Sequence, residues 1–411
     1  MVKLLRRAGA RFGALVGSDA ATLRQSMAAL LVSSGGDLLA GLTLGSITHT
    51  LEQLPGLLVL VPAAIGMRGN IFGALGSRLG TAIHAGTFSM SRRRETVVGQ
   101  NVLASIALTL SISLALAVLA KAVAVGFGVQ DTISVTDFVI ISVVGGALSS
   151  VIVLFLTLAV AARSVRKGWD LDNVSAPLVT AAGDVVTLPS LFLATYLVGV
   201  NWVSPLLALG TAALSVAALV AAVRAGLPIL RRIIRESLPV LLVAGMVDVL
   251  AGVTIEKRLA SFLVFPGMLV LVPPFLEDTG ALGGILSSRL SSKLHLGVIE
   301  PRSFPQRAAR ADFWLTFFYA VPVFALVAVS SDIAATVVGL ATPGVVKMLA
   351  ISMLGGFLAT TCAVVIAYYG AIASYRLGLD PDNHGIPLIT SSMDLIGAFA
   401  LILAIVLVGI A

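Results

Sequence analysis

Eleven long apolar runs constrain the fold of this chain more than any other feature. Each run approaches or exceeds about 20 residues, the length that an α-helix needs to cross a bilayer core about 30 Å thick. Backbone groups find no water in that core, so a helix must satisfy them internally. We therefore predict an all-α polytopic membrane protein with about 11 transmembrane helices, at residues 27–50, 55–84, 101–127, 134–162, 177–200, 203–224, 237–262, 264–296, 313–330, 343–374 and 386–410.

The composition agrees with a membrane protein and excludes several other classes. Hydrophobic residues make up 58% of the 411 residues and charged residues 11%, against about 45–50% and about 25% in soluble domains. An ordinary soluble enzyme, a disordered chain and a coiled coil are therefore excluded. We expect a protein that is not an enzyme and that uses no organic cofactor. The single cysteine, Cys362, excludes a disulfide framework, and its place in an apolar run predicts a packed thiol.

The chain contains an internal duplication. Residues 55–62 read PGLLVLVP and residues 266–273 read PGMLVLVP, an offset of 211. The offset also pairs Asp37 with Asp248, and after a one-residue deletion it pairs WDLDNVSAPLVTAAGD at 169–184 with LDPDNHGIPLITSSMD at 379–394. A register held over most of the chain indicates duplication. We divide the chain into a cytosolic N-terminal segment at 1–23, a five-helix repeat at 24–200, a linker with one extra helix at 201–234 and a second five-helix repeat at 235–411.

The extra helix and the basic residues predict the topology. Two directly joined five-helix units would be inverted, so the unmatched span at 203–224 predicts parallel repeats. Most of the 27 lysines and arginines fall on one side of the membrane if the N-terminus is cytoplasmic, as the positive-inside rule requires. This placement accounts for the net charge of +7 without nucleic acid. We expect an integral protein of the plasma or inner membrane, with the N-terminus cytoplasmic and the C-terminus outside.

Four aspartates within the spans are candidates for function: Asp37, Asp184, Asp248 and Asp394. Each carboxylate at mid-bilayer costs roughly 2.5–3.5 kcal/mol. Asp184 follows Asn173 by 11 residues, a rise of about 16 Å that reaches the midplane. Two facing carboxylates repel each other unless a cation lies between them. We predict that Asp184 and Asp394 bind one hydrated Mg²⁺, a hard cation that prefers oxygen ligands. Burial as structural acids remains an alternative, more so for Asp37 and Asp248, from which we expect smaller effects.

Further polar residues are candidates for pore-lining or supporting roles. Proline and glycine within the second span of each repeat predict interrupted helices, which often form transport sites; the alternative is a kink that serves helix packing. The candidates are Thr180, Thr390, Asp37, Asp248, Asn70, Glu277 and Asp278.

These motifs resemble those of a known family. The five-span repeat, Gly69-Asn70 in span two and the P-L-[VI]-T-x-x-x-D element that ends at Asp184 and Asp394 resemble the MgtE-type magnesium transporters. The duplicated form is similar to the eukaryotic solute-carrier magnesium transporters. The resemblance covers residues 24–410 and implies a pore between the two repeats, with Asp184 and Asp394 as the central ion site. Phe72 and Gly280-Ala281 depart from the family pattern in span two.

The leading functional hypothesis is a transporter or channel for divalent cations, with Mg²⁺ as the transported ion. One alternative is a secondary carrier of a small organic solute that uses the acids as proton relays. Another is a membrane assembly subunit without transport activity. Because the duplication supplies two pore halves, we expect a single chain in the lipid bilayer to suffice, while larger assemblies remain open.

Overall fold

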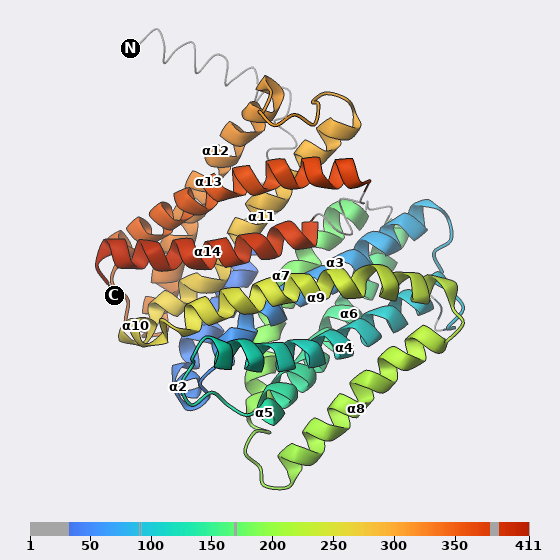
Figure 1. The fold of residues 1–411 in the computed structure, drawn as a ribbon, viewed down its shortest axis with the longest axis horizontal. Helices are drawn as coiled ribbons and strands as arrows, with labels where there is room; N and C mark the ends of the chain where they lie inside the picture. The colour runs from blue at the N-terminus through green and yellow to red at the C-terminus, as the bar shows by residue number, and fades with distance from the viewer. Residues whose placement is uncertain (1–32, 90, 92, 168–170, 379–385, 411) are drawn as a thin grey trace.

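The computed structural model describes residues 33–89, 91, 93–167, 171–378 and 386–410, and it is helical with no strand in these residues. Ten of its helices are long and apolar enough to cross a membrane. The helical segment 33–46 is the described part of the first predicted span. These findings confirm an all-α polytopic membrane protein (Figure 1).

The helices follow the predicted apolar runs in order. They are α2 (Thr48–Gln53), α3 (Leu57–His84), α4 (Val97–Gly126), α5 (Val135–Val139), a π-helical turn (Ile140–Gly145), α6 (Gly146–Lys167), α7 (Leu171–Thr195), α8 (Val203–Arg224), α9 (Pro228–Glu256), α10 (Leu259–Val264), α11 (Gly267–His295), α12 (Arg307–Val337), α13 (Val345–Leu377) and α14 (Ile386–Val408). We call the helices up to α7 the first set and those from α9 onward the second set.

Several helices are longer than the apolar runs that predict them. α9 begins at Pro228, not near 237, because proline suits the first helical position. Its first turns carry arginines and so extend beyond the apolar run. α12 likewise has arginines in its first turn and begins at Arg307, six residues before the predicted start. An apolar run therefore reports the part of a helix that contacts lipid or core, while the polar ends remain helical.

The second span of each set is not interrupted, contrary to the prediction. α3 is continuous from Leu57 to His84 with Pro62 inside it, and α11 is continuous through Pro273 and Pro274. Each proline removes one backbone donor, but packing against neighbouring helices maintains the helix in a membrane protein. The glycines that follow the prolines are helical, and Gly69, Gly73 and Gly280 line a cavity.

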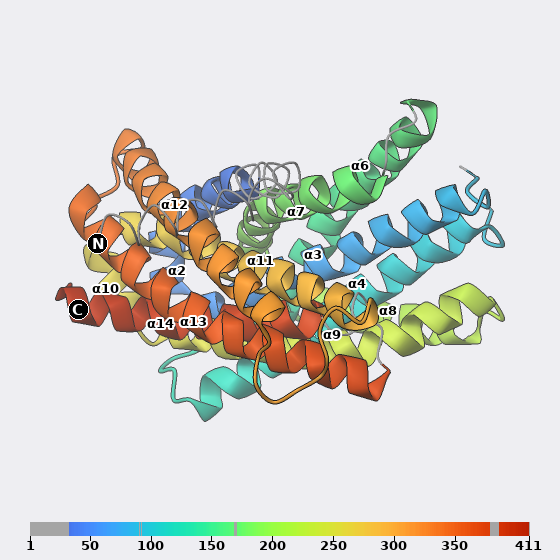
Figure 2. The ribbon, with the colours of Figure 1, turned by 90° about the horizontal axis from the view of Figure 1, so that it is seen from above.

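The first helix of each set bridges to the other set. In the helical segment 33–46, an added Cβ at Gly41 would collide with the carbonyl oxygen of Val270 on α11; in α9, one at Gly252 would collide with that of Val59 on α3. The two contacts are related by the 211-residue offset. Figures 1 and 2 show α9 lying between α14 and the helices of the first set, α3 and α4.

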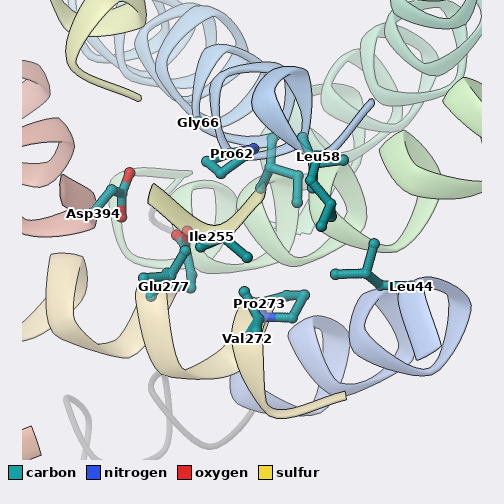
Figure 3. A pocket seen from close by; sticks show the side chains of 12 residues that line it. Leu44, Leu58, Pro62, Gly66, Ile255, Val272, Pro273, Glu277 and Asp394 are labelled. Atoms are coloured by element: carbon teal, nitrogen blue, oxygen red, sulfur yellow. The ribbon is translucent and has the colours of Figure 1, made fainter. Parts of the chain in front are cut away.

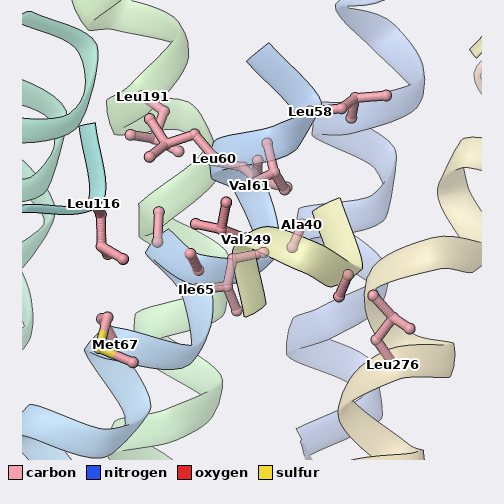
Figure 4. Close-up of a cluster of buried hydrophobic side chains, with 14 of the residues drawn as sticks. Ala40, Leu58, Leu60, Val61, Ile65, Met67, Leu116, Leu191, Val249 and Leu276 are labelled. Carbon is pink, nitrogen blue, oxygen red and sulfur yellow. The ribbon is translucent and has the colours of Figure 1, made fainter. Parts of the chain in front are cut away.

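The apolar core joins both sets. Ala40, Val61, Val249 and Leu276 come from four different helices and belong to one buried cluster (Figure 4). The periphery is apolar as well: only 17% of the apolar window of α8 is buried, as expected where lipid replaces water. For the same reason the prediction of a packed thiol at Cys362 is wrong, since this side chain is exposed on the surface of α13.

Candidate ion site

The four membrane aspartates form two carboxyl pairs. Asp37, in the helical segment 33–46, faces Asp184 on α7. Asp248 on α9 faces Asp394 on α14. Each pair joins the first and last helices of its own set, and the two pairs are related by the sequence duplication. The sequence analysis gave Asp37 and Asp248 only supporting roles, whereas the structure brings each of them against a predicted ion ligand.

The paired carboxyl groups lack ordinary compensation. Asp37 and Asp184 are each 1% exposed and Asp248 is fully buried. None of the oxygens of these three side chains accepts a hydrogen bond from a donor among the described residues. Carboxylates offer acceptors only, so two of them at close range repel each other unless a proton or a cation lies with them. The three side chains are therefore buried acids whose oxygens have no donor among the described residues.

A polar cavity of about 620 Å³ reaches these acids. Asp184 and Asp394 both line it, from α7 and α14. Its wall also includes Ser77 and Thr81, which are exposed, so the cavity reaches the surface near the C-terminal end of α3. The cavity therefore connects that surface to the carboxyl pairs within the span.

A second pocket lies beyond the acids and is narrow and apolar. Its volume is about 30 Å³, room for about two waters. Residues related by the 211-residue offset line it in pairs, among them Leu44 with Ile255 and Val61 with Val272. Figure 3 shows Leu44 at one end of this pocket and Glu277 and Asp394 toward the other end. The pocket marks the place where the two sets meet in corresponding positions.

The structure distributes the predicted polar residues among three places. Thr180, Thr390 and Asn70 line the cavity with Asp184. Glu277 lines both the cavity and the narrow pocket. Asp278 lines neither; it is fully buried and accepts the Ser34 hydroxyl at 3.0 and 2.9 Å. Asp278 thus holds the helical segment 33–46 against α11.

The sequence analysis overlooked a buried arginine in α3. Arg68 is 2% exposed; its Nε donates to Ser149 Oγ at 3.0 Å and its Nη2 to Ser113 Oγ at 3.3 Å. These hydroxyls are on α6 and α4, beside the π-helical turn, and Arg68 lines neither pocket. A charge within an apolar span is itself the signal that identifies such a residue. Its place indicates helix packing away from the cavity.

The donor set suits a hydrated ion. In the described part of the chain, no three His, Cys, Asp or Glu side chains are grouped to hold a metal ion directly. Mg²⁺ usually keeps several waters and is held by one or two carboxylates. Carboxyl groups of Asp184 and Asp394 and the residues Thr180 and Thr390 line one cavity, so the oxygen groups there are of the kind that such an ion uses.

Comparison with known proteins gives consistent similarities. The chain is 27% identical over 420 residues to solute carrier family 41 member 3 of Rattus norvegicus, covering 96% of this chain and 89% of the relative. It is 25% identical to member 2 of Xenopus laevis, covering 92% and 71%, and 24% identical to member 2 of Homo sapiens, covering 92% and 69%. No solved structure matches the chain.

The profile of one family matches the chain twice. The MgtE profile, described as a divalent cation transporter, matches residues 61–194 and 272–404, together more than half of the chain. The two matches contain Asp184 and Asp394 and reproduce the offset of the internal duplication. The chain therefore belongs to the MgtE family of divalent cation transporters.

Proposed function

We propose that this chain transports Mg²⁺ through a central site between the two repeats, where Asp184 and Asp394 contact one hydrated ion. The observation that carries the proposal is that two pairs of buried carboxyl groups, with few hydrogen-bond donors, lie at the end of a 620 Å³ cavity. A divalent cation supplies the missing countercharge in a medium of low dielectric. Family membership supports a divalent cation as the substrate.

The two pockets favour a state that is open on one side. The polar cavity has room for a hydrated ion, whereas the narrow pocket of about 30 Å³ does not. We therefore assign the apolar pairs around Leu44 and Ile255 to a closed gate on the opposite side. Passage of the ion requires this gate to widen, since Mg²⁺ sheds its waters reluctantly.

The proposed organisation is two parallel repeats at 24–200 and 235–411, joined by a linker at 201–234. Recurrence of helix bounds supports the division into two repeats: α2 and α10 are related by the 211-residue offset, as are the C-terminal ends of α3 and α11. We place the N-terminus in the cytoplasm and the C-terminus outside, in the plasma or inner membrane. A C-terminal tag labelled by an impermeant reagent on intact cells tests this topology; a protected tag contradicts it.

Uptake of Mg²⁺ into proteoliposomes tests the function. The purified chain should admit Mg²⁺, detected by an enclosed fluorescent indicator, while empty vesicles should not. Asp184→Asn and Asp394→Asn should each abolish or strongly reduce uptake, because an amide keeps the shape but removes half of the countercharge. Glu52→Gln, at an exposed position on α2, is the matched control. Wild-type rates in both asparagine variants would refute the proposed site.

A further inference from the structure

The polar cavity and the narrow pocket share four lining residues: Ile65, Gly66, Glu277 and Asp394. We call this set the neck. Two of its members are carboxylates, and both come from the second set of helices, Glu277 from α11 and Asp394 from α14. Figure 3 shows the two side chains at the same end of the narrow pocket. A cation that leaves the cavity for the gate therefore passes both carboxyl groups.

The neck departs from the symmetry of the duplication. The residue that corresponds to Glu277 at an offset of 211 is Gly66. A Cβ at Gly66 would lie 3.0 Å from Asp248 Oδ2 and 3.9 Å from Asp394 Oδ2. The glycine thus lets the α3 backbone approach one carboxyl pair closely, whereas the corresponding position in α11 supplies a carboxylate. Since only one of the two corresponding positions carries an acid, packing that is common to both repeats does not explain Glu277.

Glu277 lies among other buried acids. It lines the narrow pocket with Asp394 and the cavity with Asp184 and Asp394, and Asp278 follows it in α11. Asp184, with both oxygens buried and unpartnered among the described residues, lines the cavity beside it. A further negative charge at this buried position is costly without a cation, so the position of Glu277 indicates a residue that binds a cation.

We propose that Glu277 binds the transported cation and that, together with Asp394, it forms a binding site at the neck that selects divalent ions. The proposal rests on the proposed Mg²⁺ transport and adds a position between the cavity and the gate. Two carboxylates balance the charge of one divalent ion, whereas a monovalent ion leaves one negative charge uncompensated in a medium of low dielectric. Two binding sites in succession allow an ion to bind and then to move on, which conduction requires.

The test compares Glu277→Gln with Asp278→Asn in proteoliposomes that take up Mg²⁺ at several concentrations, with external Na⁺ or with choline. Both changes remove one buried negative charge, one residue apart, but only Glu277 lines the pathway. Glu277→Gln should raise the half-saturating Mg²⁺ concentration about tenfold, which equals about 1.4 kcal/mol, and should make uptake sensitive to Na⁺. Asp278→Asn should shift it less than about threefold, and Glu277→Asp should keep the insensitivity to Na⁺.

A binding measurement distinguishes weaker Mg²⁺ binding from a loss of folding in the variant. Mg²⁺ should raise the unfolding temperature of the detergent-solubilised wild type through preferential binding to the folded state, and it should do so less in Glu277→Gln. Equal effects of Glu277→Gln and Asp278→Asn, or wild-type behaviour of Glu277→Gln, would overturn the binding site at the neck while wild-type Mg²⁺ uptake still upheld the proposed function. Failure of the wild type itself to transport Mg²⁺ would overturn the function.

Discussion

The reciprocal crossing of the first helices makes a quantitative prediction about two glycines. In Gly41→Ala the new methyl group meets the backbone carbonyl of Val270, and in Gly252→Ala it meets that of Val59. A backbone oxygen cannot rotate aside as a side chain can, so the crossing helices must move apart. Gly210→Ala, in the middle of α8 with nothing within 4 Å of the added Cβ, is the matched control.

The magnitude follows from two opposing effects. Overpacking of a tight contact costs about 1–3 kcal/mol, while replacing glycine by alanine within a helix gains about 0.5–1 kcal/mol. Gly41→Ala and Gly252→Ala should therefore lower the free energy of unfolding by up to about 2.5 kcal/mol. Gly210→Ala should raise it by up to about 1 kcal/mol, because it has the helical gain without the collision.

Unfolding of the purified variants in one detergent, followed by tryptophan fluorescence, measures these differences. The double variant should lose about the sum of the two single losses, since the two crossings share no contact. If Gly41→Ala and Gly252→Ala were as stable as Gly210→Ala, the exchange of first helices between the two sets would be refuted.

Two further predictions concern the carboxyl pairs and a helix start. Combining Asp37→Asn with Asp184→Asn should weaken the Mg²⁺-dependent rise in unfolding temperature non-additively, because both changes alter one pair. Combining Asp37→Asn with Asp248→Asn, which alters both pairs, should weaken it additively. Additivity within a pair would contradict the pairing. Glu256→Gln should lower the free energy of unfolding by about 0.5–2 kcal/mol, since Glu256 accepts the amides of Gly56 at 2.8 Å and Leu58 at 3.1 Å at the start of α3. Thermal unfolding against Glu52→Gln measures this loss, and equal stability would exclude a capping role.

The fold class and the approximate helix positions could be predicted from the sequence. A bilayer demands about 20 apolar residues per crossing, and this demand is local, so it can be read from consecutive residues. The extra helix α8 matches the apolar run at 203–224 at both ends. The cost of charge in hydrocarbon likewise identified Asp184 and Asp394 as exceptional, and both lie within the two segments that match the family profile.

Which acids lie together could not be predicted from the sequence and depends on the packing of the helices. Asp37 and Asp184 are far apart in the chain, and nothing in their spacing specifies that they form a pair. That choice depends on close approach of helices at small residues such as Gly36, where an added Cβ would lie 2.9 Å from the Ala181 carbonyl oxygen. Contacts of this kind depend on the shapes of two surfaces at once, which hydrophobic patterns do not contain. The neck could not be predicted for the same reason. Gly66 and Glu277 occupy corresponding positions in the sequence, but only the packing of the helices places both at the junction of the two pockets.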